Sequence, residues 1–245
     1  MPEFASLAQA AVWSIGIGFL PIGIWLMFWL FQDWRHPEPR QRLLIAFLVG
    51  MLTVPLILSL ESGVTAFVPY GYLLLFLWAL IEEGVKLIAA WFFVLRHRAV
   101  DEPIDMPVYL ITVALGFAAI ENALFLFAPL MSGGFLESVI TGNLRFIGPT
   151  LIHVLGASIV GGALAMTFFR SSSEKFYYAV AAVILATSLH TFFNFLIITT
   201  GAQKVLTVFL VVWVAIVFVL LALERIKLLH PPAWWEKIFI RTTEQ

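Results

Sequence analysis

The sequence predicts an all-α protein, a polytopic transmembrane helix bundle of about seven spans. Hydrophobic residues make up 62% of the 245-residue chain and charged residues 12%, with a mean hydropathy of +1.00. Soluble domains are only about half apolar and about a quarter charged. The apolar residues also gather in stretches that approach or exceed the ~20 residues a helix needs to cross a bilayer. The length fits a single integral membrane domain over residues 1–245, without a separate soluble module.

The spans follow from these apolar stretches, taken in chain order. The first is too long for a signal-peptide core and no basic segment precedes it, so we expect a retained span. The second is short and contains Pro55, and the fifth carries a ridge of small residues that favours close helix packing. The predicted spans are 10–31, 43–60, 70–95, 107–130, 146–169, 176–199 and 204–223. The polar or Gly- and Pro-rich breaks between them are 33–42, 61–69, 96–106, 131–145, 170–175 and 200–203.

The distribution of basic residues predicts the orientation. Cytoplasmic loops carry an excess of Lys and Arg. Arg145 and Lys204 fall on one side of the predicted membrane, and Lys86 falls inside the third span. The other 11 of the 14 basic residues fall on the opposite side: Arg35, Arg40, Arg42, Arg96, Arg98, Arg170, Lys175, Arg225, Lys227, Lys237 and Arg241. We therefore expect the N-terminus outside and the C-terminus in the cytoplasm.

Composition also limits the partners and the chemistry. The net charge is −1 and basic runs are absent, which argues against nucleic acid as a partner. The chain has no cysteine, so disulfides, thiolate metal sites and cysteine nucleophiles are excluded. The lipid bilayer is the expected environment.

Six ionisable residues lie inside the predicted spans, where a charge costs at least ~2.5–3.5 kcal/mol and usually marks function. They are Glu82, Glu83, Lys86, Glu121, His153 and His190. At 1.5 Å per helical residue, all but the lysine fall roughly 11–20 Å below the predicted outer surface. Four helices that alternate in direction thus place them in one layer. We expect a shared site on the outer side of the membrane midplane.

Glu82 and Glu83 can each meet Lys86, because they precede it by four and three residues on one helix. One interpretation is an ion pair that only lowers the cost of insertion. In the other, one carboxylate binds or deprotonates water while its neighbour pairs with the ammonium group. The spacing alone leaves both open.

Two histidines with a carboxylate are a frequent zinc ligand set that leaves one position open for water. Glu121, His153 and His190 would supply that set from three helices. Each could instead be a neutral hydrogen-bonding residue between helices. Asn194 shares a helix face with His190, and its amide could orient water or stabilise an oxyanion.

The order of these residues resembles the PrsW family of bacterial intramembrane proteases and, more distantly, the CAAX prenyl protease superfamily. The segment Glu82–Lys86 (EEGVK) matches the family's EExxK element, and Gly116–Asn122 (GFAAIEN) contains its FxxxE element. The segment His190–Asn194 (HTFFN) matches the HxxxD/N element, and His153 stands where the family has a further histidine. The resemblance covers roughly residues 70–200.

The resemblance implies hydrolysis of a peptide bond in a single-span membrane protein, in or near the outer half of a bacterial cell membrane. An anti-sigma factor is the substrate in characterised relatives. Glu82 or Glu83 would activate water on a zinc held by Glu121, His153 and His190. Lys86 would fix one of the two glutamates, and Asn194 would help to hold the oxyanion. Distant relatives suggest a glutamate mechanism without metal as a variant.

Two other functions fit part of the pattern. A proton- or cation-coupled transporter also places Glu, His and Lys near the midplane. However, we find no inverted repeat, and the polar residues form one layer instead of a pathway. A non-catalytic binder of single-span proteins is the second alternative. Metal content of the purified protein would discriminate these from a metalloprotease.

Overall fold

A computed structural model describes residues 7–31, 37–132, 134–200 and 205–232, and within these ranges it contains helices and no strands. This confirms the all-α prediction for the described chain. The helices are α1 (Leu7–Leu30), α2 (Arg40–Thr65), α3 (Tyr72–Ala90), α4 (Asp105–Met131), α5 (Phe135–Ile147), α6 (Pro149–Met166), α7 (Ser172–Thr200) and α8 (Val205–Ile226). The five-residue π-helical turn η2 (Trp91–Leu95) continues α3.

Six helical segments of the described chain are long and apolar enough to cross a membrane. They are α1, α2, α4, α7, α8 and the combined stretch Phe135–Met166, which contains α5 and α6. Helix α3 carries three charged residues and is not in this group. The membrane-protein prediction is thereby confirmed, whereas seven spans and the direction of insertion stay predictions.

Two predicted breaks are wrong. Helix α2 continues to Thr65, so Glu61 is helical and does not lie in a loop. Most of the segment 131–145 forms α5, whose buried residues Ser138, Gly142 and Arg145 are three or four positions apart. That spacing places them on one helix face. The segment looked like a loop because this buried face is made of small and polar residues.

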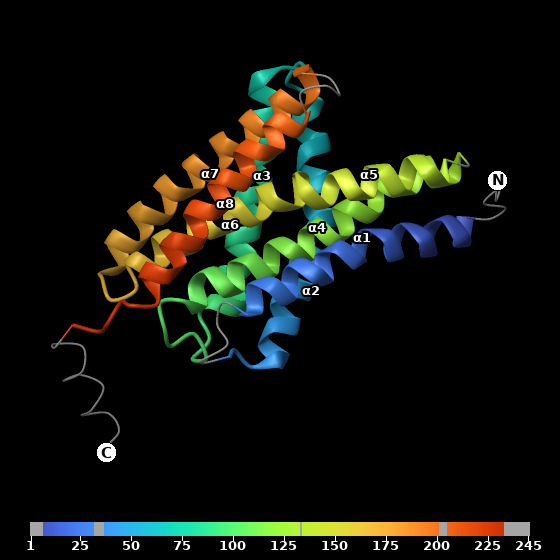
Figure 1. Ribbon diagram of the computed structural model, residues 1–245. Helices are drawn as coiled ribbons and strands as arrows, with labels where there is room; N and C mark the ends of the chain where they lie inside the picture. The colour runs from blue at the N-terminus through green and yellow to red at the C-terminus, as the bar shows by residue number, and fades with distance from the viewer. Residues whose placement is uncertain (1–6, 32–36, 133, 201–204, 233–245) are drawn as a thin grey trace.

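Helices α4 and α6 form the centre of the bundle (Figure 1). Helices α1 and α2 pack on α4, α7 and α8 pack on α6, and α3 packs between α2 and α7. Consistent with this arrangement, 72% of the apolar window of α4 is buried, compared with 22% in α1 and in α8. The outermost helices therefore offer most of the apolar surface that a bilayer would cover.

Glycines set the close contacts around α4. A Cβ on Gly50 of α2 would lie 2.0 Å from the carbonyl oxygen of Val113, and a Cβ on Gly116 of α4 would lie 2.0 Å from that of Phe47. The predicted small-residue ridge on α6 is confirmed at Gly161, where a Cβ would lie 2.4 Å from the Cα of α4 residue Pro107. Small residues thus let backbones approach where larger side chains could not fit.

The bundle is splayed at one end. Figure 1 shows α5 and the first part of α1 diverging from α3 and α7 towards the end that carries the α2–α3 and α4–α5 connections. Helix α5 packs on α1, α4 and α6. The opening between these two groups of helices positions the site.

Candidate active site

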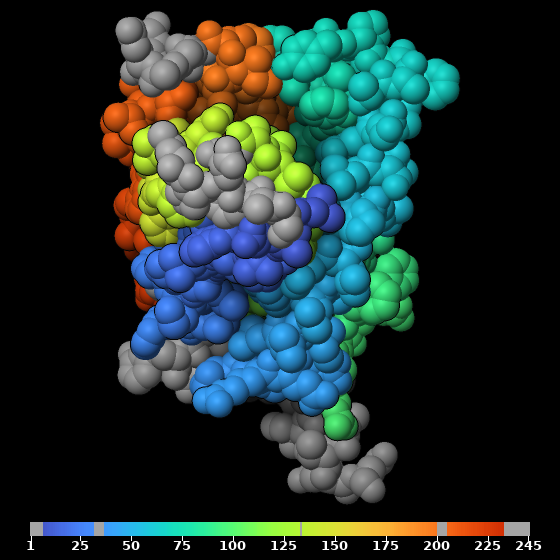
Figure 2. Space-filling model, turned by 90° about the vertical axis from the view of Figure 1, so that its right-hand side faces the viewer, coloured from blue at the N-terminus to red at the C-terminus, as the bar shows by residue number. Residues whose placement is uncertain are grey.

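A cleft of about 640 Å³ lies where the helices splay apart, and it is named here the site cleft. Helices α2 to α7 all contribute to its walls. Figure 2 views the molecule from the splayed end and shows a hollow between α5 (yellow-green) and the α2–α3 pair (teal). The walls are mostly apolar, and the polar side chains among them are Glu61, Trp78, Glu82, Glu121, Arg145, His153, His190 and Asn194.

The two adjacent glutamates of α3 contact different partners, because consecutive helical residues point about 100° apart. Glu83 is turned inward, and its Oε1 lies 2.7 Å from Nζ of Lys86. Both residues are only 4% exposed, so each buried charge is compensated by the other. Glu82 instead lines the site cleft. Of the pair, Glu82 is therefore the carboxylate that a substrate or water can reach.

His190 of α7 bridges the two glutamates. Its Nδ1 lies 3.1 Å from Oε1 of Glu83, and its Nε2 lies 3.9 Å from Oε2 of Glu82. Gly156 of α6 leaves room for this arrangement, because a Cβ there would come within 3.0 Å of Glu83 Oε2. A carboxylate that accepts from one ring nitrogen fixes the orientation of the ring. Glu83 thereby aims Nε2 of His190 towards Glu82.

His153 of α6 is held in the same manner by a different carboxylate. Its Nε2 lies 2.9 Å from Oε2 of Glu121, and its Nδ1 lies 3.7 Å from Oε2 of Glu82. The same Nδ1 is 3.3 Å from Nζ of Lys86. The rings of His153 and His190 meet edge to face, with centroids 5.0 Å apart. Each histidine thus presents one nitrogen to Glu82 and the other to a carboxylate.

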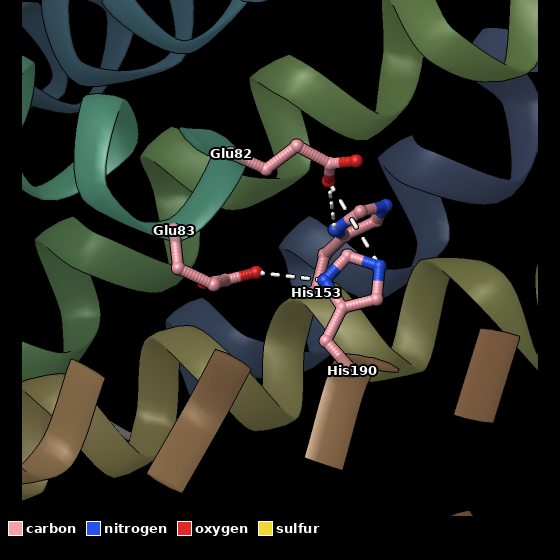
Figure 3. Close-up of side chains that lie close together, drawn as sticks. All are labelled: Glu82, Glu83, His153 and His190. Atoms are coloured by element: carbon pink, nitrogen blue, oxygen red, sulfur yellow. Dashed lines mark hydrogen bonds and ion pairs between the residues drawn. The ribbon is translucent and has the colours of Figure 1, made fainter. Parts of the chain in front are cut away.

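The donor atoms of Glu82, Glu83, His153 and His190 lie within 4.8 Å of one another, and all four residues are buried. Figure 3 shows the Glu82 carboxylate pointing towards the two imidazole rings, with Glu83 beside His190. Within the described chain, Oε2 of Glu82 is buried without a hydrogen-bond partner. A buried oxygen of this kind calls for a ligand. Two imidazole nitrogens face it, so the residues fit a metal ion.

The structure brings together all six ionisable residues expected in one site. Glu121 lies beyond His153 and outside the group of four that could hold a metal, with its Oε2 also 2.6 Å from Nη2 of Arg145. Asn194 lies one turn beyond His190 and lines the site cleft. The individual roles assigned to these residues stay predictions.

Sequence reasoning missed several polar residues of the site cleft. Arg145 was counted as an outer-loop charge, yet it occupies the last turn of α5 and is 8% exposed. Asn122, which directly follows Glu121 in the sequence and was given no role, accepts from Nε of Arg145 at 2.6 Å. Glu61 was placed in a break but lines the site cleft. Asn122 was a usable signal, because a second buried polar group beside Glu121 requires a partner.

Comparison with known proteins decides the family. The model of the PrsW family of intramembrane metalloproteases matches residues 38–222. The chain belongs to the PrsW family. It is 32% identical over 190 residues to the protease PrsW of Geobacillus kaustophilus, which covers 75% of this chain and 79% of the relative. It is 27% identical over 207 residues to the protease PrsW of Oceanobacillus iheyensis, and this match covers 82% of this chain and 89% of the relative. No solved structure matches the chain.

Membership of the PrsW family confirms several predictions. The chain is an intramembrane protease of a metallopeptidase family, and its apolar helices place it in the bacterial cell membrane. A lipid environment and membrane-protein substrates follow from the same findings. The family match spans all the residues of the site cleft, from Val54 to Ile198. The more distant link to CAAX proteases stays a prediction.

Proposed function

We propose that Glu82 is the central catalytic residue of this PrsW-family protease. We further propose that Glu82, His153 and His190 hold a zinc ion. The unpartnered Oε2 of Glu82 carries this assignment, since it faces His153 Nδ1 and His190 Nε2 at 3.7 and 3.9 Å. Tetrahedral zinc with bonds of ~2.0–2.2 Å separates its ligand atoms by about 3.3–3.6 Å. Small side-chain shifts would bring the three atoms to that spacing.

This ligand set differs in one member from the set that the sequence predicts. Oε2 of Glu121 is already engaged with Arg145 at 2.6 Å and with His153 at 2.9 Å. Glu121 is therefore better suited to orient His153 than to bind the ion itself. Metal-ligating histidines usually donate their second ring N–H to such an outer carboxylate.

Bound zinc would supply a Lewis acid that brings the pKa of water to about 7 and polarises the scissile carbonyl. The chain's own residues then have distinct tasks. Glu82 lines the site cleft, and with Oε2 on the ion its other oxygen, Oε1, would take the proton from the attacking water. Glu83 and Lys86 hold His190 in place, and Glu121 holds His153. The Asn194 amide donates to the oxyanion of the peptide group under attack.

The shape of the site cleft supports a membrane-anchored substrate with a single span. Its apolar walls suit a hydrophobic segment, and Figure 2 shows a hollow on the face at the splayed end. We assign that end to the outer face of the membrane, because the basic residues gather on the loops of the other end. We propose an anti-sigma factor, cut on its extracytoplasmic side, as the substrate class. Residues 1–245 would work as one domain.

The function is tested with purified protein in liposomes and a fluorescent single-span substrate, with cleavage products identified by mass spectrometry. Wild-type protein should release product, lose activity with a zinc chelator and recover it when zinc is added back. Persistent activity under chelation, together with an inactive Glu82→Gln variant, would replace the metal mechanism by a glutamate mechanism. Ion flux without cleavage would favour the transporter alternative.

Orientation is tested separately by single-cysteine labelling, which the absence of native cysteine makes simple. Cysteines at Thr65 and Ser132 should react with a membrane-impermeant reagent added outside the cell. A cysteine at Arg98 should react only after permeabilisation. The reverse pattern would place the opening of the site cleft on the cytoplasmic side.

A further inference from the structure

Arg145 is a buried cation in the wall of the site cleft, and the tasks described above leave it without a role. It ends α5 and is 8% exposed. Its Nη2 donates to Oε2 of Glu121 and its Nε donates to Oδ1 of Asn122, both at 2.6 Å. Its guanidinium carbon lies 4.0 Å from the centre of the Phe125 ring. Three residues of α4 therefore fix one side chain of α5.

The contact to Asn122 extends this arrangement to α6. Nδ2 of Asn122 donates to Oγ1 of Thr150 at 3.1 Å, and Thr150 is fully buried in the first turn of α6. Thr150 precedes His153 by three residues on the same helix. The guanidinium group thus connects α4 and α5 with the turn of α6 that carries a site histidine.

The contact to Glu121 reaches His153 directly. Oε2 of Glu121 accepts from Arg145 and lies 2.9 Å from His153 Nε2. A carboxylate at Nε2 requires the proton on that nitrogen, so Nδ1 is left as the acceptor. Nδ1 is the nitrogen that faces Glu82, at 3.7 Å. The Lys86 ammonium group, 3.3 Å from Nδ1, favours the same tautomer, so the Glu121 carboxylate chiefly fixes the orientation of the ring through its hydrogen bond with Nε2.

We propose that Arg145 is a positioning residue of the active site. It fixes the Glu121 carboxylate against His153 Nε2 and so keeps His153 Nδ1 directed at Glu82 and His190. The part of this proposal that concerns metal affinity rests on the proposed function. The part that concerns the orientation of the His153 ring does not.

The arrangement requires arginine in particular. A guanidinium group offers donors in a rigid planar fork, so it can reach Glu121 and Asn122 at once while stacking on an aromatic ring. A lysine at this position would keep the charge beside Glu121 and leave Asn122 Oδ1 without its donor. Arg145→Lys should therefore behave as an intermediate between wild type and Arg145→Gln.

The direct test is the hydrogen bond at His153 Nε2 in metal-free protein, read from ¹⁵N NMR of histidine-labelled samples. The His153 signals are assigned by their loss in His153→Asn. Wild-type protein should show one tautomer with the proton on Nε2. Arg145→Gln should keep that tautomer, because Lys86 still contacts Nδ1, but should move and broaden the Nε2 signal as its hydrogen bond with Glu121 loosens, with Arg145→Lys between the two. The matched control is Arg170→Gln, which removes an exposed 3.0 Å pair with Glu174 and should leave the His153 signals unchanged.

The second measurement is zinc affinity by competition with a chromophoric chelator, in a double-mutant cycle with Glu121→Gln. Loss of an outer partner of a ligating histidine typically weakens metal binding 10–100-fold. Arg145→Gln should show a loss of this size in the wild-type background and almost none beside Glu121→Gln. Circular dichroism and thermal melting show whether each variant folds. If Arg145→Gln does not fold, Arg145→Lys replaces it in both backgrounds of the cycle.

The results separate the two proposals. A folded Arg145→Gln variant with the wild-type Nε2 signal of His153 would overturn the positioning role, whatever the metal does. Equal losses of affinity in both backgrounds would also overturn it, because Arg145 would then not act through Glu121. Wild-type protein that binds no zinc would overturn the zinc assignment, and the NMR measurement would still decide the role of Arg145.

Discussion

Two similar units flank Glu82, and each consists of a histidine, a carboxylate and a cation. In the first unit Lys86 holds Glu83, which holds His190. In the second unit Arg145 holds Glu121, which holds His153. The first takes its carboxylate and cation from one helix, three residues apart, whereas the second takes them from α4 and α5. The same arrangement around a histidine has therefore been built once locally and once across helices.

The two units also differ in burial. The side chains of Lys86 and Glu83 are 5% and 3% exposed, whereas that of Glu121 is 23% exposed in the wall of the site cleft. An ion pair removed from water depends on its partner far more than one that solvent can reach. We therefore expect the first unit to matter for folding as well as activity, and the second to matter chiefly for activity.

The largest effect on activity is expected at Glu82, because the histidines of both units face its carboxylate. Glu82→Gln should lower kcat by about 10⁴-fold or more, because it removes the proton acceptor together with a ligand oxygen. Cleavage of the single-span substrate in liposomes measures this loss. The matched control is Glu174→Gln at an exposed site far from the cleft, which should keep wild-type activity. An active Glu82→Gln variant would move the chemistry to another residue.

The difference in burial is tested by removing each cation. Lys86→Met should reduce the free energy of unfolding by about 3–5 kcal/mol, because it leaves the buried Glu83 uncompensated. Arg145→Gln should cost less, since Glu121 can be partly hydrated. Unfolding in mixed micelles measures both values. The double variant Glu83→Gln/Lys86→Met should regain most of the stability without regaining activity. Equal losses in the two single variants would remove the distinction between the units.

Asn194 lies in the site cleft beyond both units, so its loss should leave them intact. Asn194→Ala is expected to lower kcat by about 10²–10³-fold, the usual result of losing one oxyanion donor. Zinc affinity should stay at the wild-type value, in contrast to His153→Ala and His190→Ala, which should lose both metal and activity. A fall in zinc affinity in Asn194→Ala would instead place this amide in the first unit with His190.

The smallest effect concerns the space beside the first unit. A methyl group in Gly156→Ala would come to 3.0 Å from Glu83 Oε2, so the carboxylate must shift by a few tenths of an ångström. We expect kcat to fall by about tenfold, since small displacements of catalytic groups are costly. Gly162→Ala on the same helix is the control, with its nearest side-chain atom at 3.7 Å. Identical activity in both variants would show that the first unit tolerates such a shift.

The contrast between the units also explains what the sequence could predict. Lys86 lies within one helical turn of both glutamates, so the spacing predicted a pair with one of them and left open which one. Helix geometry also predicted the common depth of Glu121, His153 and His190. The rotation of each helix about its axis is set by packing, as at Gly50 and Gly116, and no local pattern encodes it. That rotation decides that Glu121 faces Arg145 and that Glu82, not Glu83, lines the site cleft.

Helix α5 was missed for a related reason. Its buried face holds a serine, a glycine and an arginine, which in isolation are typical of a loop. They become a helix face only when α1 and α4 lie beside it. The arginine of that face is the residue that completes the second unit.

Three charged residues of the site cleft, Glu61, Glu121 and Arg145, are named here the polar strip. They affect how water reaches the site and whether the substrate backbone can unwind there. Glu61 near the end of α2, Glu121 and Arg145 place charged groups in the mostly apolar walls of the cleft that Glu82 also lines. Charged groups bind water more strongly than apolar walls do, so these residues favour a hydrated cleft. A transmembrane helix must also unwind before its peptide bond can be attacked, and lipid offers no partners for the freed backbone groups. The same strip that admits water therefore provides hydrogen-bonding partners for an extended chain.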